Sequence, residues 1–294
     1  MPARDLEDVL KEVRRIQIVA RRQVNDLLAG EYLSAFQGRG MEFNAVREYV
    51  PGDEIRSIDW NVTARAGAPY VKTFCEEREL TVMLMVDASA SNAFGSQRLS
   101  KMETAVEVAA VLMFAALKNN DKVGLLFFAD DVIKYIPPRK GRSNVLRLIR
   151  ELLAMEPVKA RTDIAGALEF LGKVQRRKCI LFLMSDFLGS ECSRELAVAN
   201  RRHDCVAVTL QDPRENTLPD VGFATLRDAE TGELLELDTR HPKVRALFAR
   251  VADEREQKLS GWLRRANVDR LTIRTDQSYA QSLQRFFRAR ERQR

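Results

Sequence analysis

The chain has 294 residues, of which 45% are hydrophobic and 31% are charged. This globular composition excludes a disordered or fibrous protein. The formal net charge is +6, but the tail from Arg285 to Arg294 contains five Arg and one Glu and so supplies +4 of it. The rest of the chain is close to neutral and gives little reason to expect binding to nucleic acid.

Cysteine usage and hydropathy indicate the compartment. The four cysteines form no CxxC pair, which disfavours a disulfide scaffold and a structural zinc site and fits a reducing environment. No apolar stretch approaches the roughly 20 residues that a membrane span needs. The first residues also lack the apolar core of a signal peptide. We therefore expect a cytoplasmic protein.

Two segments precede the main part of the chain. In residues 1–37, apolar side chains recur from Leu6 to Leu28 at helical spacing, and Gly30 ends the pattern. We expect this helix to pack on its own protein, because its Arg-rich polar face is typical of a solvated surface, although docking into a partner's groove is the alternative. Residues 38–79 contain short extended pieces broken by Gly and Pro, which predict a small β-rich module.

Residues 80–294 alternate apolar strands with helices, a pattern that predicts an α/β fold with a Rossmann-like, doubly wound, mostly parallel sheet. The expected strands are Leu80–Val86, Lys122–Phe128, Cys179–Met184, Cys205–Leu210 and Arg270–Ile273. The expected helices lie near Lys101–Leu117, Asn144–Ala154, Ile164–Val174, Arg194–Arg202, Pro242–Arg265 and Tyr279–Arg288.

Two strand segments depart from this alternation. Val132–Ile136 follows the second strand after a link too short for a parallel crossover, so it should form an antiparallel edge strand. A β-hairpin insertion is expected near residues 222–238, with Thr231 and Gly232 in its turn.

Oxygen-bearing side chains follow the predicted strands where ligands bind in open α/β sheets. Asp87, Ser89 and Ser91 come at alternate positions after the first strand, Thr162 opens a helix, and Asp186 follows another strand. This set contains no His or Cys and suits Mg²⁺, or Mn²⁺, with a coordination position left for an incoming carboxylate. The alternative is that these are ordinary turn and cap residues. Two neighbours are candidates to hold the metal ligands in place without binding the metal themselves: Asp163 and Ser185.

Two sets of motifs carry a family resemblance. The segments DASAS, TDIAGAL and SDF resemble the metal-ion-dependent adhesion site (MIDAS) of von Willebrand factor A (vWA) domains. The segment VREYVPGDEIRSIDWNVTARAGAPYVKTFCEERE is similar to the hallmark of domain-of-unknown-function family 58 (DUF58), bacterial proteins that carry this domain. The resemblance implies a six-stranded sheet and a metal site that matches the family motif at every position: Asp87, Ser89, Ser91, Thr162 and Asp186. It also implies a protein partner, a MoxR-type AAA+ ATPase, in chaperone-like assembly or maturation of other proteins.

A charged and aromatic cluster in the β-rich module is either a recognition surface or an internal network. We favour a network in which Arg47 and Arg56 pair with acidic neighbours around a packed Trp60, because buried charges are usually paired. The full cluster is Arg47, Tyr49, Gly52, Asp53, Arg56, Asp59 and Trp60.

The sequence favours a Mg²⁺-dependent protein–protein interaction module and not an enzyme. It has no GxSxG element and no Walker A motif, and its two histidines fall at the boundaries of predicted elements. One alternative is a metal-dependent hydrolase that uses the same carboxylates together with Asp163. Another is RNA binding through the Arg-rich C-terminus, with Phe286 and Phe287 stacking on bases. Against the latter, we expect Leu283 and both phenylalanines to be buried and the arginines to point to water.

Overall fold

The computed structural model describes residues 6–24, 32, 35–36, 42–75, 79–189, 191–229 and 231–293. The chain divides into two compact units. The larger unit comprises Met1–Phe36 and Leu80–Arg294, and the smaller comprises Gln37–Glu79.

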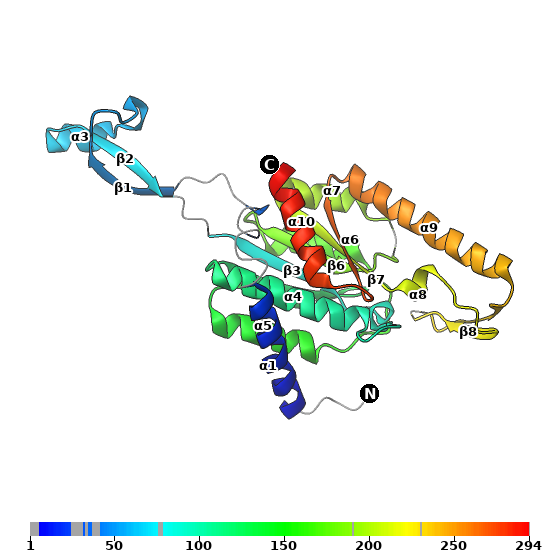
Figure 1. The fold of residues 1–294 in the computed structure, drawn as a ribbon. Helices are drawn as coiled ribbons and strands as arrows, with labels where there is room; N and C mark the ends of the chain where they lie inside the picture. The colour runs from blue at the N-terminus through cyan, green and yellow to red at the C-terminus, as the bar shows by residue number, and fades with distance from the viewer. Residues whose placement is uncertain are drawn as a thin grey trace. The chain divides into compact units, whose positions relative to one another are not determined.

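The larger unit is built on a central sheet flanked by helices (Figure 1). This sheet has six strands in the order β10-β7-β6-β3-β4-β5. Neighbouring strands are parallel except β4 and β5, which pair antiparallel at one edge. The predicted mostly parallel α/β fold with one antiparallel edge strand is therefore confirmed. The strands are β3 (Thr81–Asp87), β4 (Lys122–Phe128), β5 (Val132–Arg139), β6 (Ile180–Ser185), β7 (Asp204–Gln211) and β10 (Asp269–Arg274).

Helices cover both faces of the sheet, because alternate strand residues such as Leu84 and Met85 enter different apolar cores. One core contains buried side chains from α1 (Leu6–Gln23), α4 (Lys101–Lys118), α5 (Arg142–Ala154) and α10 (Tyr279–Gln293). The other contains side chains from α6 (Ile164–Val174), α7 (Ser193–Arg202) and α9 (Pro242–Arg265). Among the described residues, none of the helices combines the length and the hydrophobicity that a membrane span requires.

The two ends of the chain meet on one face of the sheet. Val13 and Ile16 of α1 are buried in the first core, so the expected packing of this helix on its own protein is confirmed. Phe287 of α10 is fully buried and cannot stack on a base. The expectation that the C-terminal arginines all point to water is wrong for Arg290, which is 7% exposed. Its guanidinium pairs with Asp204 and Asp269, so burial is compensated by two carboxylates.

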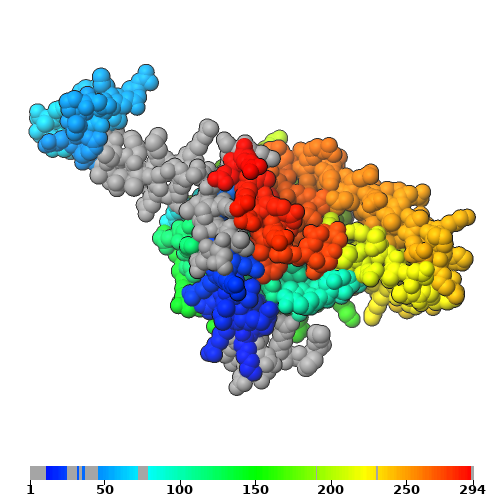
Figure 2. Space-filling view, in the orientation of Figure 1, coloured from blue at the N-terminus to red at the C-terminus, as the bar shows by residue number. Residues whose placement is uncertain are grey.

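A hairpin and a short helix connect β7 to α9. They are α8 (Pro213–Asn216), β8 (Phe223–Arg227) and β9 (Leu234–Asp238). The hairpin strands pair antiparallel, with Phe223 opposite Asp238. Figure 2 shows this segment in yellow beside the orange α9, at one end of the larger unit.

The smaller unit contains the antiparallel pair β1 (Glu42–Glu48) and β2 (Tyr70–Cys75). It also contains two helical turns that the sequence pattern does not predict, η2 (Ile55–Ser57) and α3 (Trp60–Ala66). The side chain of Asp59 caps α3 by accepting from two backbone N–H groups.

The charged cluster of this unit matches the expected network in the pairing of Arg47 but not in the packing of Trp60. Arg47 forms a two-pronged ion pair with Asp53, with N–O distances of 2.6 and 2.7 Å. Trp60, however, is 67% exposed, so the expected packing around it is wrong. The physical reason is that Trp60 begins a helix of only 7 residues, which has too few neighbours to enclose an indole ring.

The buried cysteines give a first testable prediction. Cys179, Cys192 and Cys205 are reduced and at most 3% exposed, and burial raises the pKa of Cys179 and of Cys192 to about 12. Because the thiolate is the reactive form, we expect Ellman's reagent at pH 8 to leave all three unlabelled until the protein unfolds. The Cys75 side chain lies outside the described residues, so the test uses Cys75→Ser. Rapid labelling of this variant under native conditions would contradict the burial of the three thiols.

Candidate metal centre

The predicted site residues lie at the point where the sheet changes its direction of winding. From β3 the chain continues to β4 on one side, whereas β6 pairs with the other side of β3. Asp87 is the last residue of β3, and Asp186 directly follows β6. The carboxyl ends of neighbouring parallel strands form a crevice at such a switch point, and this is where open α/β sheets bind ligands.

Asp87 is 1% exposed and accepts hydrogen bonds on both carboxylate oxygens. Its Oδ1 accepts from the Ser89 backbone N–H at 2.9 Å. Its Oδ2 accepts from the hydroxyls of Ser185 at 2.6 Å and Thr162 at 3.3 Å. The structure therefore brings Thr162, from the loop before α6, to the carboxylate that ends β3. It also gives Ser185 a direct supporting contact.

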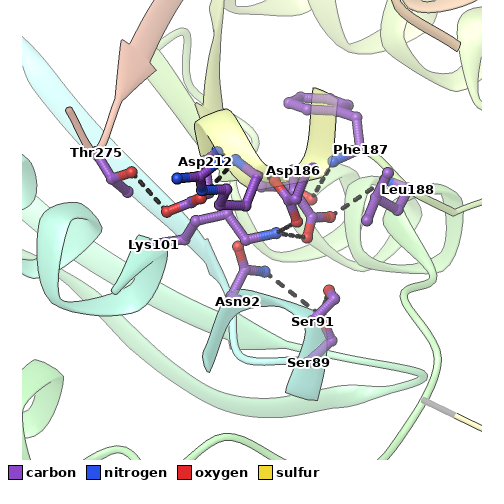
Figure 3. A network of polar contacts seen from close by, with 12 residues as sticks. Ser89, Ser91, Asn92, Lys101, Asp186, Phe187, Leu188, Asp212 and Thr275 are labelled. Carbon is purple, nitrogen blue, oxygen red and sulfur yellow. Dashed lines mark hydrogen bonds and ion pairs between the residues drawn. The ribbon is translucent and has the colours of Figure 1, made fainter. Parts of the chain in front are cut away.

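The loop after Asp87 forms a short helical turn, η3 (Ala90–Ala93), which turns its polar side chains inward. The hydroxyl oxygens of Ser89 and Ser91 are 3.0 Å apart. Asn92 is fully buried and donates from Nδ2 to Ser89 Oγ at 3.4 Å. Figure 3 shows the Asn92 side chain pointing from this turn toward Asp186 and Lys101.

Lys101, the first residue of α4, is a site residue that the sequence reasoning missed. It is fully buried, and its Nζ donates to Asp186 Oδ2 at 2.6 Å (Figure 3). The same Nζ donates to Glu215 Oε1 at 2.5 Å. The other oxygen of Asp186 accepts from the Leu188 backbone N–H at 3.2 Å. An ammonium from α4 therefore joins the carboxylate after β6 to a carboxylate of α8.

Burial and neighbouring charges perturb the acids and the lysine of this site. Burial raises the pKa of Asp87, the charge of Asp186 raises it further, and hydrogen bonds from Ser185 and Ser89 only partly offset this. Burial acts to lower the pKa of Lys101, but the charges of Asp186 and Glu215 outweigh it and hold the pKa above its usual value. Lys101 therefore stays protonated and positively charged. The negative charge of ionised Asp87 is not fully compensated by its hydrogen bonds.

The residues present fit a hard divalent cation. A cation would relieve the repulsion that raises the pKa of Asp87, and the hydroxyls of Ser89, Ser91 and Thr162 supply neutral oxygen donors beside it. Among the described residues Asn92 Oδ1 is buried without a hydrogen-bond partner, so an oxygen acceptor is available next to Ser89. The described part of the chain has no group of three His, Cys, Asp or Glu suited to a metal, so binding would depend on these neutral oxygens.

Asp163 contributes to the site by holding the backbone. Its side chain accepts from Gly166 N at 3.0 Å and caps α6, and its own N–H donates to Ala129 O at 2.7 Å. These bonds fix the start of α6 and, with it, the adjacent Thr162. The hydrolase alternative requires the Asp163 carboxylate to lie at the metal. The bonds given above instead direct this carboxylate to the backbone of α6.

A second buried carboxylate ties the loop before α4 to the neighbouring strand ends. Asp212 is fully buried and accepts from Ser96 N at 2.8 Å, Ser96 Oγ at 2.5 Å, Thr275 Oγ1 at 2.7 Å and Arg214 N at 2.9 Å. Asp212 and Glu215 also form the capping box of α8. The helix that carries Glu215 to Lys101 therefore starts at this network.

Comparison with known proteins gives one family. Residues 45–258 match the model of the family described as "Protein of unknown function DUF58". The chain is 32% identical over 293 residues to the uncharacterized protein Mb1516 of Mycobacterium bovis, a match that covers 98% of this chain and 92% of the relative. Among solved structures, the hypothetical protein BatB from Bacteroides thetaiotaomicron is similar at 17% identity and a TM-score of 0.47, covering 72% of this chain and 99% of that one. The SpRpn10 VWA domain is similar at 13% identity and a TM-score of 0.40, and the match covers 70% of this chain and 94% of that domain.

Proposed function

The chain belongs to the DUF58 family, and we propose that it is a Mg²⁺-dependent protein–protein interaction module. Its metal ligands would come from Asp87, Ser89, Ser91, Thr162 and Asp186. The bound cation would supply a coordination position for a carboxylate of the partner. Mn²⁺ has similar ligand preferences and would serve in its place.

One observation carries this proposal. Two carboxylates from neighbouring strands are buried next to three hydroxyls, and the charge of Asp186 raises the pKa of Asp87. Lys101 already compensates Asp186, whereas the charge of Asp87 costs stability in this buried crevice unless a further cation or a proton compensates it. A bound divalent cation would supply this compensation, and the three hydroxyls would then serve as its neutral ligands.

The arrangement supports binding more than catalysis. A hydrolase would need a general base within hydrogen-bond reach of a metal-bound water. His203 instead lies with Nδ1 3.4 Å from Cys179 Sγ, and His241 is at the start of α9. The chain would therefore act as an adaptor without covalent chemistry. By its resemblance to DUF58 proteins, its partner would be a MoxR-type AAA+ ATPase that assembles or matures other proteins.

The test uses a purified MoxR-type ATPase from the same genome. The ATPase is captured on immobilised wild-type protein in Mg²⁺ or EDTA, and on Asp87→Asn in Mg²⁺. Asp253→Asn is the matched control, because Asp253 is an exposed aspartate on α9. We expect capture by wild type and by Asp253→Asn in Mg²⁺ only. Equal capture in EDTA would show that these proteins bind without a metal bridge.

A further inference from the structure

Lys101 is a cation built into the candidate metal centre. Its Nζ is 2.6 Å from Asp186 Oδ2, and its side chain is 0% exposed. Within the described part of the chain, Asp186 and Glu215 are the two carboxylates at ion-pair distance from this ammonium. Any divalent cation that uses the charge of Asp186 must therefore share this carboxylate with Lys101.

Charge counting shows what the lysine changes. In their ionised forms Asp87, Asp186 and Glu215 carry three negative charges, and Lys101 reduces the sum to two. One divalent cation balances that sum. Without Lys101 one negative charge would remain, which would strengthen cation binding and repel the carboxylate of an incoming partner.

We propose that Lys101 is the specificity-determining residue of the metal centre: it lowers the affinity for divalent cations and matches the site to one such cation together with an anionic partner group. This inference rests on the proposed function of the same site. Glu215 is the counterpart, because it draws the ammonium partly away from Asp186. The two residues should therefore change metal affinity in opposite directions.

The experiment is a Mn²⁺ titration of the full-length protein, followed by electron paramagnetic resonance of the free ion. The variants are Lys101→Met, Lys101→Arg, Glu215→Gln and the double variant Lys101→Met/Glu215→Gln. A charge within about 4–6 Å moves a carboxylate pKa by about 1–3 units, so we expect each charge change to alter the Mn²⁺ dissociation constant at least about tenfold. Lys101→Met should tighten binding, Glu215→Gln should weaken it, and Lys101→Arg should stay near wild type.

The double variant keeps the test decisive if Lys101→Met alone does not fold. It removes the partly buried carboxylate of Glu215 together with the lysine, so it should bind Mn²⁺ at least about tenfold more tightly than Glu215→Gln. A lysine that only holds Asp186 in place predicts the opposite result, because its loss would then weaken binding in both backgrounds. Unchanged or weaker binding when folded Lys101→Met is compared with wild type, or the double variant with Glu215→Gln, would overturn the role of Lys101 alone. Absence of Mn²⁺ binding by wild type would instead overturn the proposed function and this inference with it.

Discussion

Asp87→Asn should abolish the thermal stabilisation by Mg²⁺ and leave the metal-free protein at least as stable as wild type. Asparagine retains the size of the side chain and an oxygen that can accept from Ser89 N, whereas the hydroxyl of Ser185 can rotate to accept from the new amide. The substitution removes the buried carboxylate of Asp87, whose pKa is raised by burial and by the charge of Asp186. Fold and metal binding therefore respond to it in opposite ways.

The size of the effect follows from linkage. At a Mg²⁺ concentration one hundred times the dissociation constant, binding stabilises the native state by about 2.7 kcal/mol. For a domain of this size about 1 kcal/mol corresponds to roughly 2–4 °C, so wild type should gain about 5–10 °C in Tm. Differential scanning fluorimetry in Mg²⁺ and in EDTA measures this gain, with Asp253→Asn as the control that should keep it. A full Mg²⁺ gain in Asp87→Asn would show that this carboxylate does not bind the metal.

Asp87→Ala is a less informative substitution than Asp87→Asn. The sequence alone predicts that the loop that begins at Asp87 lies outside the core and that Asp87→Ala leaves the fold intact. In the structure Asp87 is 1% exposed and accepts three hydrogen bonds. Alanine would leave those donors without an acceptor, so loss of metal binding and loss of stability would be mixed.

The second large effect is expected at Asp212, where alanine should lower the free energy of unfolding by about 3–5 kcal/mol. Four donors from Ser96, Arg214 and Thr275 would lose their buried acceptor. Urea unfolding at pH 7 measures the loss. Asp276→Ala is the matched control, because Asp276 forms a surface ion pair with Arg274 and should change stability by less than about 1 kcal/mol. Equal small losses in both variants would contradict the structural role of Asp212.

The contribution of Asp212 should depend on pH in a defined direction. Burial acts to raise its pKa, but hydrogen bonds from Ser96, Arg214 and Thr275 outweigh it, so the folded pKa is lowered. A lowered folded pKa means that the contribution is present above the unfolded value of about 3.9 and is lost as the pH falls through the folded pKa. The difference in stability between wild type and Asp212→Ala should therefore be smaller at pH 3 than at pH 7. A difference that grows at low pH would contradict this sign.

Much of the larger unit could be predicted because its signals are local. Continuous apolar runs marked strands such as Lys122–Phe128, and helical periodicity marked Ile164–Val174 and Pro242–Arg265, which the structure reproduces with the same bounds. The short helix α3 gave no such signal, since its 7 residues complete barely two turns and none of them is buried. The exposure of Trp60 could not be predicted either, because it depends on how little of the small unit surrounds the ring.

The candidate site was predictable only in part, and for a physical reason. Residues at strand ends are placed by the sheet, so Asp87 and Asp186 could be expected at one edge. Lys101 comes directly after the helix cap Ser100, where a lysine is usually solvated, and its partners are 85 and 114 residues further along the chain. Its buried ammonium contacts Asp186 after β6 and Glu215 of α8, and no local pattern encodes these contacts. Asn92 could have been included from the sequence, because it directly follows the predicted ligand Ser91 in the same loop.

The most direct test of the central claim is a titration of the wild-type protein with Mn²⁺, with Mg²⁺ as competitor. We expect one Mn²⁺ bound per chain, displaced by Mg²⁺, with the same behaviour in Asp253→Asn and loss of binding in Asp87→Asn. If wild type binds no Mn²⁺ at millimolar concentration, or if Asp87→Asn binds it as wild type does, then Asp87 and Asp186 do not form a metal centre.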